Sequence, residues 1–386
     1  MTECVAIVYQ LVPYHDARFS AAASRVDLSV VELFGQNQGM VWSRGVARSF
    51  PTVSLQLAKG TPAFGLKRRL VDTLEDVNPR VIAVQGWAGA GALDAILWAR
   101  GRGVRVIVFS ESNIYDHPRH AAKEWVKSRV LKLCDAALVG GRDHVSYLEA
   151  LGFERDRIAL GYNAVDNAHF APLQGAEAAG TAISRPYYLI ASRLAPEKNL
   201  ARGLEAYARY RTVAGAAAWD LRIIGVGPLE AELRARSRAL GLDGHAYFEG
   251  FKSYEELPAY YHHAGALLHP SAEEPWGLVV NEALAAGLPV IVSNRCGCCC
   301  ELLRDGVNGF SVDPFDVAGM ADRMVELAHG TVDRRVFGRA SRALIAKWGP
   351  ERFAEGFREA FELAQSKPTR PNIIDRTSVW SLAVWK

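Results

Sequence analysis

The sequence lacks several features that would assign the protein to a particular class. Its 386 residues include 45 basic and 42 acidic side chains, and the net charge of +3 is too small to indicate nucleic acid as the partner. No apolar run reaches the length of about 18 residues that a membrane-spanning helix needs. The first residues show neither the basic region nor the cleavage site of a signal peptide. We therefore expect a soluble, cytoplasmic enzyme.

Cysteine is also scarce, and four of the six cysteines lie between residues 296 and 300. Paired zinc ligands are usually separated by about two to four residues, and consecutive cysteines cannot easily face one ion. Without a secretory signal, disulfide bonds are not expected either. The sequence favours reduced thiols in a turn, with adventitious metal binding or redox sensitivity as the alternative. The four residues are Cys296, Cys298, Cys299 and Cys300.

Apolar runs alternate with helical stretches along the first half of the chain. Such runs, when they are continuous and separated by helices, are typical of parallel strands covered on both faces. Residues 171–185 are rich in Ala and Gly without apolar periodicity, which indicates a linker. The same alternation then begins again. The predicted strands lie at 4–12, 80–86, 105–112, 136–141, 187–192, 221–227, 245–250, 265–271 and 289–294.

This pattern predicts an α/β protein with two doubly wound, Rossmann-like domains that face a central cleft. Open α/β sheets bind ligands beyond the carboxyl ends of their strands, so functional residues are expected directly after strands. The predicted N-terminal domain covers residues 1–170 and the C-terminal domain covers residues 186–348.

The stretch "EEPWGLVVNEALAAGLPV" places two glutamates on either side of a helix start. Glu274 precedes the helix, while Glu282 lies inside it among apolar residues. The backbone amides of Gly277, Leu278 and Val279 have no helical acceptor and form a site for an anion. A buried carboxylate needs hydrogen-bond donors, which the paired hydroxyls of a ribose would supply. The alternative is that Glu274 is a helix-dipole partner and Glu282 is capped or faces solvent.

Further charged and glycine residues follow other strands of the second domain. Arg193 and Lys198 lie at one strand-to-helix turn, where two cations suit a diphosphate, although a surface pair with Glu197 is the alternative. Gly227 ends another strand, but such glycines are also needed for steric reasons. Phe251 follows a third strand, and from this position we expect backbone groups near Gly250 and Phe251 to contact the edge of a base.

Taken in order, these motifs resemble the donor domain of the retaining GT-B glycosyltransferases of family 4 (group 1). The resemblance runs from Tyr187 to Asp316 and rests on "SRLAPEK", "IIGVGP", "FEG", "HPSAEEPWGLVVNEALAAGLPVIVS" and "ELLRDGVNGFSVDP". It implies a GT-B fold, and it implies that residues 349–386 form a returning helix and a tail that pack on the first domain.

The resemblance also implies roles for individual residues. Glu282 would bind the ribose, Arg193 and Lys198 the diphosphate, and Glu274 the donor sugar. The donor would be a UDP- or GDP-sugar, and transfer would retain the anomeric configuration without a metal or cofactor. The expected catalytic residues are Glu274, Arg193, Lys198 and Glu111, and the expected donor-binding residues are Arg193, Lys198, Gly227, Phe251, Glu274, Trp276, Gly277, Leu278, Val279 and Glu282.

The N-terminal half departs from the family pattern. The glycine-rich loop after the first strand is replaced by "LVPYHDARFS", in which His15 and Arg18 are candidates to face the acceptor. Where relatives often carry a histidine, the chain reads "VIVFSESNIYDHPRH". Either Glu111 or His117 would take that place, and a purely structural role is the alternative.

The nature of the acceptor is open between a glycan, a lipid-linked acceptor and a small molecule. Basic residues in 118–133 alternate with apolar ones at helical spacing, which suits peripheral contact with the inner face of the membrane or a solvated helix face. The two tryptophans of residues 377–386 would anchor likewise or pack on the first domain.

Three other functions compete with glycosyl transfer in surface polysaccharide or glycan biosynthesis. A GT-B sugar-nucleotide epimerase would share the fold, but the glutamate pair and "SRLAPEK" argue against it. A non-catalytic nucleotide-sugar-binding protein should have lost the charged site residues, which are all present. A nicotinamide-dependent dehydrogenase would need a glycine fingerprint after the first strand, which is absent from the sequence.

Overall fold

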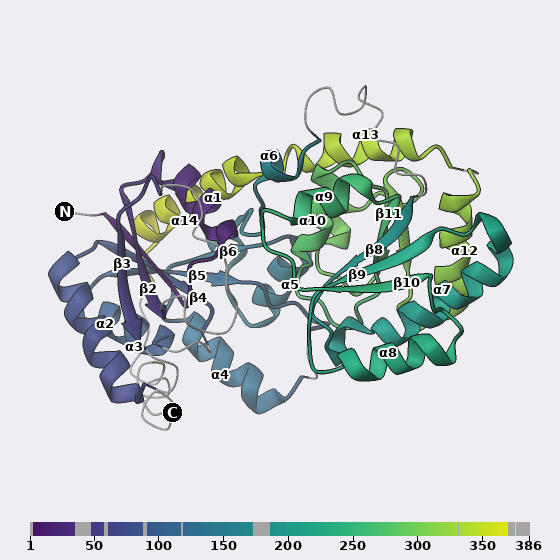
Figure 1. Ribbon diagram of the computed structural model, residues 1–386. Helices are drawn as coiled ribbons and strands as arrows, with labels where there is room; N and C mark the ends of the chain where they lie inside the picture. Colours follow the sequence, from purple (N-terminus) through teal and green to yellow (C-terminus); the bar gives the residue numbers. More distant parts are fainter. Residues whose placement is uncertain are drawn as a thin grey trace. The chain divides into compact units, whose positions relative to one another are not determined.

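The computed structural model describes residues 3–34, 48–57, 61–87, 91–116, 119–172, 186–330, 332–369 and 375. The chain divides into two compact units, the first comprising Met1–Ala164 with Pro350–Lys386 and the second Val165–Gly349 (Figure 1). Most of the predicted linker, the tail 377–386 and the candidate His117 lie outside the described residues.

The first unit contains a seven-stranded sheet in the order β3-β2-β1-β4-β5-β6-β7. Every described pairing in it is parallel, and Cys4 on β1 is in register with both Leu28 and Val81. Apart from the edge strand β3, which is partly exposed, its strands are largely buried on both faces, which explains their continuous apolar sequences. The strands are β1 (Cys4–Val8), β2 (Leu28–Phe34), β3 (Thr52–Leu57), β4 (Val81–Gln85), β5 (Arg105–Ser110), β6 (Ala136–Val139) and β7 (Ile158–Leu160).

Helices cover both faces of this sheet. The returning helix α14 belongs to this unit because Phe353 and Phe357 are fully buried against Phe19 and Phe109. Its apolar residues recur at helical spacing and therefore form one buried face. The helices are α1 (Pro13–Ala23), α2 (Ala63–Val77), α3 (Ala92–Arg102), α4 (Ala121–Leu131), α5 (Arg142–Ala150) and α14 (Pro350–Ser366).

The second unit repeats the architecture with a six-stranded sheet in the order β10-β9-β8-β11-β12-β13. Its described pairings are also parallel. Its strands are β8 (Tyr187–Ala191), β9 (Asp220–Ile224), β10 (Ala246–Gly250), β11 (Ala266–His269), β12 (Val290–Ser293) and β13 (Gly309–Val312). Its α-helices are α6 (Asn167–Phe170), α7 (Leu200–Ala214), α8 (Glu230–Ala239), α9 (Leu257–His263), α10 (Leu278–Ala285), α11 (Cys299–Leu302), α12 (Val317–Ala328) and α13 (Arg334–Ile345).

The prediction of an α/β protein with two Rossmann-like domains is confirmed. In both sheets the strand order reverses once, between β1 and β4 and between β8 and β11, and such points are where open α/β sheets bind ligands. The predicted domain boundary at residue 170 differs from that of the compact units, because Phe170 on α6 is buried and packs edge-on against Tyr254 and Tyr261 of the second unit.

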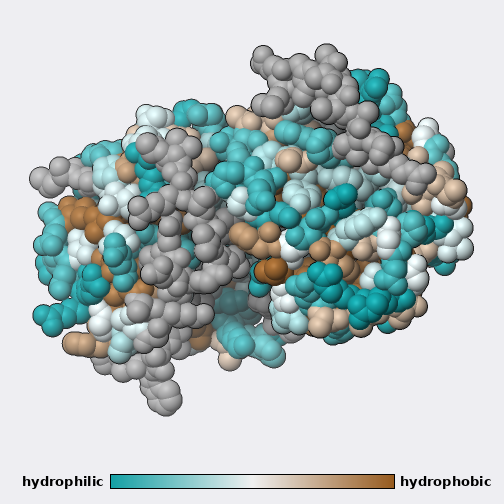
Figure 2. Space-filling view, viewed as in Figure 1, coloured by the Kyte–Doolittle hydropathy of each residue, from teal (hydrophilic) through white to brown (hydrophobic). Residues whose placement is uncertain are grey.

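The surface mixes polar and apolar residues on the face shown in Figure 2. Within the described residues, no helix is both long and apolar enough to cross a membrane.

Candidate functional site

Glu274 lies at the centre of a buried polar cluster that follows strand β11. Its Oε2 accepts hydrogen bonds from Lys198 Nζ at 2.5 Å, from His269 Nε2 at 3.0 Å and from Ser271 Oγ at 3.4 Å. The side chains of Glu274 and His269 are only 10% and 2% exposed. All of these hydrogen bonds reach the same carboxylate oxygen. None from the described residues reaches Oε1, which therefore remains available to a ligand hydroxyl.

The cluster keeps Glu274 ionised. Burial alone would raise the pKa of this carboxyl, but the hydrogen bond and charge of His269 and the charge of Lys198 outweigh it, so the pKa falls to about 2. A carboxylate held in this state is a strong acceptor for sugar hydroxyls.

Two loops are joined to bring Lys198 and Glu274 together. The carbonyl of Glu197 accepts hydrogen bonds from the amides of Ala272 and Glu273. Asn199 has φ 55° and is 7% exposed, and its Nδ2 donates to the carbonyl of Pro270 at 3.0 Å. The turn after β8 is thereby fixed to the turn after β11, at the point where the strand order reverses.

The start of helix α10 lies next to this cluster. Gly277 has φ 98°, and a Cβ there would lie 3.3 Å from His269 Nε2 and 3.4 Å from the side chain of Glu274. A side chain at this position would therefore be strained and would press on the cluster. The first-turn amides of Leu278 and Val279 have no acceptor within the helix and face an anion favourably.

Glu282 is buried inside α10, with 1% of its surface exposed, and accepts a hydrogen bond from the Tyr261 hydroxyl of α9. The Tyr261 hydroxyl therefore supplies one of the hydrogen bonds that the buried carboxylate needs without a ligand. The sequence did not indicate this contact.

Trp276 does not present its side chain to a ligand. It is 2% exposed, its Nε1 donates to Asn281 Oδ1 at 2.8 Å, and its ring packs against Trp348. These contacts hold the indole in the core. The expectation that Trp276 binds the donor stays a prediction, and the backbone of this residue is the part that it concerns.

The cysteine-rich turn supports the loop that carries Glu274. Residues Glu274 and Cys296 form a parallel bridge, and the amides of Gly297 and Cys298 donate to the carbonyls of Glu274 and Trp276. All four cysteines of the turn are free thiols. Burial raises the pKa of the Cys296 and Cys298 thiols well above their usual value.

Arg193 lies outside the buried cluster. Its side chain is 63% exposed and its guanidinium donates to Glu197 at 2.8 Å. The glycines after β9 bring two loops into contact: a Cβ on Gly225 would lie 1.9 Å from the Ser192 carbonyl oxygen, and one on Gly227 would lie 2.4 Å from that of Leu194. Gly227 is thus explained by close packing against the Arg193 turn. Phe251 is 42% exposed after β10.

In the first unit, His15 is buried at the start of α1. It is 8% exposed, and its Nδ1 accepts a hydrogen bond from the Val12 amide at 3.3 Å. Burial and the charge of Arg18 lower the pKa of His15 to about 3, so the ring stays neutral. The turn after β1 is also closed, because the Leu11 amide donates to buried Glu32 at 2.8 Å. The Nδ1 atom of His15 is thus occupied at the start of α1, and the expectation that His15 faces an acceptor stays a prediction.

Arg18 is 3% exposed; its Nε donates to the Ala164 carbonyl at 2.7 Å, and its guanidinium lies 5.3 Å from the Tyr162 ring centre. Nη2 has no hydrogen-bond partner among the described residues. Burial lowers the pKa of Arg18, and the nearby charges of Tyr162 and Glu111 oppose that shift.

Glu111 lines a cavity of about 200 Å³ at the carboxyl ends of β4 and β5. The other lining residues are Gln85, Gly86, Trp87, Phe109, Ser110, Ser112 and Tyr162.

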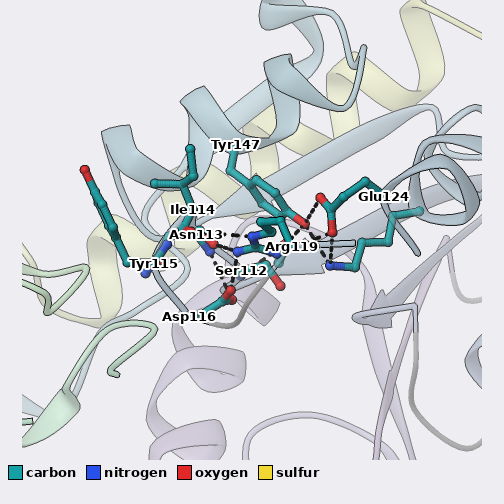
Figure 3. A network of polar contacts seen from close by, with 10 residues as sticks. Ser112, Asn113, Ile114, Tyr115, Asp116, Arg119, Glu124 and Tyr147 are labelled. Carbon is teal, nitrogen blue, oxygen red and sulfur yellow. Dashed lines mark hydrogen bonds and ion pairs between the residues drawn. The ribbon is translucent and has the colours of Figure 1, made fainter. Parts of the chain in front are cut away.

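The loop after this cavity is fixed by Arg119 (Figure 3). Arg119 donates to Asp116, to the Asn113 carbonyl and, at 2.7 Å, to the Tyr147 hydroxyl. Tyr147 in turn donates to Glu124 at 2.6 Å. The network ties Asn113, Asp116 and Arg119 to helices α4 and α5.

The predicted basic helix is only partly a free cationic surface. Arg119 and Lys127 lie within 4 Å of Glu124, and Arg129 pairs with Asp375 at 2.9 Å. Lys123 and Lys132 are exposed.

His269, Ser271, Asn199 and Tyr261 are the residues that the motif analysis missed. His269 and Ser271 lie at the carboxyl end of β11, and polar residues there are a general indication of a site. Tyr261 had no such indication, because its contact with Glu282 joins two separate helices.

The chain is similar to known glycosyltransferases in sequence and in structure. Residues 177–344 match the family model described as glycosyl transferases group 1. A glycogen synthase from Mycobacterium tuberculosis (strain ATCC 25618 / H37Rv) is 31% identical over 204 residues, which are 52% of this chain and 46% of the relative. A GDP-mannose-dependent alpha-mannosyltransferase from Mycobacterium tuberculosis (strain CDC 1551 / Oshkosh) is 30% identical over 276 residues, 68% of this chain and 66% of the relative. The chain spans only 22% to 46% of the length of the first curated relatives that it matches.

Among solved structures, HepE from Anabaena in complex with UDP and glucose superposes with a TM-score of 0.73 at 15% identity, over 94% of this chain and all of the other. At that identity the likeness establishes the fold alone. The fold is thus the predicted GT-B fold, and the family match supports a group 1 glycosyltransferase.

Proposed function

We propose that the protein is a glycosyltransferase that moves a sugar from a nucleotide-diphosphate sugar to an acceptor hydroxyl with retention of anomeric configuration. The observation that carries the proposal is the buried cluster of Glu274, Lys198 and His269 beside the start of α10. It combines an ionised carboxylate for sugar hydroxyls with a cation and helix amides for a diphosphate.

In this proposal Glu274 Oε1 accepts from the donor sugar, and Glu282 binds the ribose next to Tyr261. Lys198 lies within reach of both Glu274 and the phosphates that the first turn of α10 would hold, and Arg193 closes the site from its exposed turn. The cations and amides stabilise the leaving diphosphate, so no metal is required for that step. Glu111, in the first unit, is the acceptor-side group.

The donor is a UDP- or GDP-sugar. UDP has the support of the HepE complexes, and GDP that of the mannosyltransferase relative. We place the reaction in surface polysaccharide or glycan biosynthesis, at the cytoplasmic side and with peripheral membrane contact through residues 118–133. A sugar-nucleotide epimerase or a non-catalytic nucleotide-sugar-binding protein is the alternative.

The test is thermal denaturation of the full chain with UDP, GDP, ADP, NAD and nucleotide sugars, with wild type and Glu282→Gln compared. A ligand that binds the folded state raises Tm by mass action. We expect one nucleoside diphosphate to raise Tm in the wild type and the increase to be lost in Glu282→Gln. Tyr261→Phe is the matched control, since it removes the protein contact and keeps the carboxylate. A response to NAD alone, or to no nucleotide, would contradict the proposal.

Hydrolysis or transfer of the responding nucleotide sugar then separates the alternatives. An epimerase would convert the sugar to its epimer without forming an acceptor product, and a binding protein would leave the nucleotide sugar unchanged.

A further inference from the structure

Asn199 has an uncommon backbone conformation at the junction between a single 3₁₀ turn, Pro196–Lys198, and helix α7. Its φ of 55° and ψ of 33° lie in the left-handed region, which glycine adopts freely and most other residues avoid. An asparagine at the start of a helix usually caps that helix with its own side chain, but Asn199 makes no such bond. What this asparagine adds over a glycine therefore lies in the contacts of its side chain with other turns.

The side chain of Asn199 joins three turns at the carboxyl edge of the sheet. Its Nδ2 donates to the carbonyl of Pro270 at 3.0 Å and to that of Pro314 at 2.7 Å, and its Oδ1 accepts from Arg202 at 3.1 Å. Two carbonyls on one side and a guanidinium on the other agree with only one placement of the amide nitrogen and oxygen. Because Pro270 follows β11 and Pro314 follows β13, one side chain fastens the turn after β8 to both.

These hydrogen bonds lie away from solvent. Asn199 is 7% exposed, and both Pro270 and Pro314 are buried. A buried carbonyl that loses its donor pays the full cost of its lost hydration. We therefore expect removal of the Asn199 amide to let the three turns separate until water reaches the two carbonyls.

Lys198 is held between two links to the turn after β11. On one side the Glu197 carbonyl accepts hydrogen bonds from amides of that turn, and on the other side the Asn199 amide donates to it. The Lys198 side chain is 13% exposed, and its Nζ lies 2.5 Å from Glu274 Oε2. A lysine stem has four flexible bonds, so fixing its ammonium group costs rotamer entropy. Holding the two backbones at one separation limits the positions that the ammonium group can take.

We propose that Asn199 is a positioning residue of the donor site: by fastening the turns after β8, β11 and β13, it holds Lys198 against Glu274 in the geometry that sugar transfer requires. The inference rests on the proposed glycosyltransferase function, to which it adds a residue that acts through the Lys198–Glu274 pair. An asparagine that only formed its own turn would not be coupled to Lys198.

A double-mutant cycle on the full chain tests this coupling without any ligand. Asn199→Gly removes the amide and keeps the left-handed backbone without strain, and Lys198→Gln removes the cation of the pair. Both single variants and the double variant are unfolded in urea and compared with the wild type. We expect Asn199→Gly to raise the unfolding equilibrium constant by a factor that is at least about fivefold smaller in the Lys198→Gln background. Asn199→Asp keeps the shape but cannot donate to the two carbonyls, and it should be coupled to Lys198 in the same way.

Turnover of UDP-glucose and GDP-mannose provides a second measurement. In Asn199→Gly we expect kcat for release of nucleoside diphosphate to fall by about tenfold, because a misplaced catalytic group slows the reaction. KM should change by less than about threefold and the rise of Tm with UDP or GDP should remain, because the first turn of α10 still offers its amides to the phosphates. Asn78→Gly is the matched control: Asn78 is exposed at the end of α2 with φ 48°, and its replacement should leave kcat unchanged and show no coupling to Lys198.

The outcomes separate this proposal from the proposed function. Additive effects of Asn199→Gly and Lys198→Gln would overturn the positioning role, and a rise of Tm with UDP or GDP would then leave the proposed function standing. Unchanged kcat in Asn199→Gly would also overturn the role, because transfer would not depend on the geometry that Asn199 holds. Coupling in a protein that responds to neither nucleotide and turns over neither sugar nucleotide would remove the transferase, while the placement of Lys198 by Asn199 would stand.

Discussion

The two units place their functional groups in different ways. In the second unit the charged residues are paired with one another: Glu274 with Lys198 and His269, Arg193 with Glu197. In the first unit the described lining of the cavity consists of aromatic, amide and hydroxyl groups and one carboxylate, Glu111. The first arrangement suits a ligand with fixed charges, whereas the second presents mostly uncharged groups.

The difference also shows how a preorganised site is maintained without its ligand. Burying charges costs free energy unless they are paired, so the second unit satisfies Glu274 internally on one oxygen, while the other accepts no hydrogen bond from the described residues. Uncharged hydroxyl groups need no such pairing, because they can exchange water for ligand.

The largest effect should follow from Glu274→Gln. Neutralising this carboxylate removes the acceptor for the donor sugar and the partner of Lys198, and we expect kcat to fall by about 10²–10³-fold. The UDP-dependent rise in Tm should remain. Glu273→Gln, one residue earlier, is the control and should retain activity. Full activity in Glu274→Gln would contradict a functional role for the charged cluster of the second unit, because the cluster would then be structural.

A smaller effect is expected from His269→Gln, measured as a pH–rate profile. The pKa of Glu274 is about 2 in the folded protein against 4.5 for a free glutamate, so the stability from its ionised form is complete above pH 4.5 and is lost as the pH falls towards 2. Without His269 the pKa of Glu274 should rise, which moves the acidic loss of activity to higher pH, and kcat should fall by about tenfold. A lower kcat with an unmoved acidic limb would show that His269 only supports packing.

Arg119→Ala tests whether the loop that follows the cavity of the first unit contributes to acceptor binding. Loss of its contacts should lower stability by about 1–3 kcal/mol, because the buried carboxylate of Asp116 loses its cationic partner. Since the loop follows the cavity, KM for the acceptor should rise while the UDP response stays unchanged. Lys123→Ala on α4 serves as the control. An altered UDP response in Arg119→Ala would contradict the assignment of this loop to the acceptor side.

The smallest effect concerns the membrane. Because Arg119, Lys127 and Arg129 already have carboxylate partners, we expect weak, salt-sensitive binding to vesicles containing anionic lipid in a sedimentation assay. Lys123→Gln should reduce it by no more than about fivefold, the effect of one lysine near a surface. Tight binding that resists salt would show that apolar residues, and not the basic helix face, make the contact.

The sequence predicted the fold, and it singled out Lys198 and Glu274 in the second unit and Glu111 in the first. Continuous apolar strands, the change to a linker composition and the order of motifs after strands are local features, so they can be recognised without the structure. Lys198 and Glu274 were both singled out, but their pairing was not, because it depends on Asn199 and Glu197 joining two loops.

There is a physical reason why the remaining features could not be predicted: they depend on side-chain contacts that spacing along the chain does not reveal. Trp276 stands in the motif next to Gly277, yet its side chain turns into the core to reach Asn281. His15 and Glu32 close the turn after β1 by hydrogen bonds to its amides, and neither bond follows from spacing along the chain. The cavity itself combines the ends of two strands with Tyr162, far along the chain, and only the sheet order brings them together.

The cysteine-rich turn contains an exposed thiol that can carry a chemical label. Cys4, Cys134, Cys296 and Cys298 are buried, and burial raises the pKa of each thiol, so they react slowly near neutral pH. Cys300 is exposed, and Cys299 beside it is partly covered and donates to the Ser293 carbonyl. A maleimide fluorophore should therefore attach first at Cys300, on the turn whose backbone is bonded to the Glu274 loop. Such a label would report on the state of that loop in the unmodified sequence, without the introduction of a new cysteine.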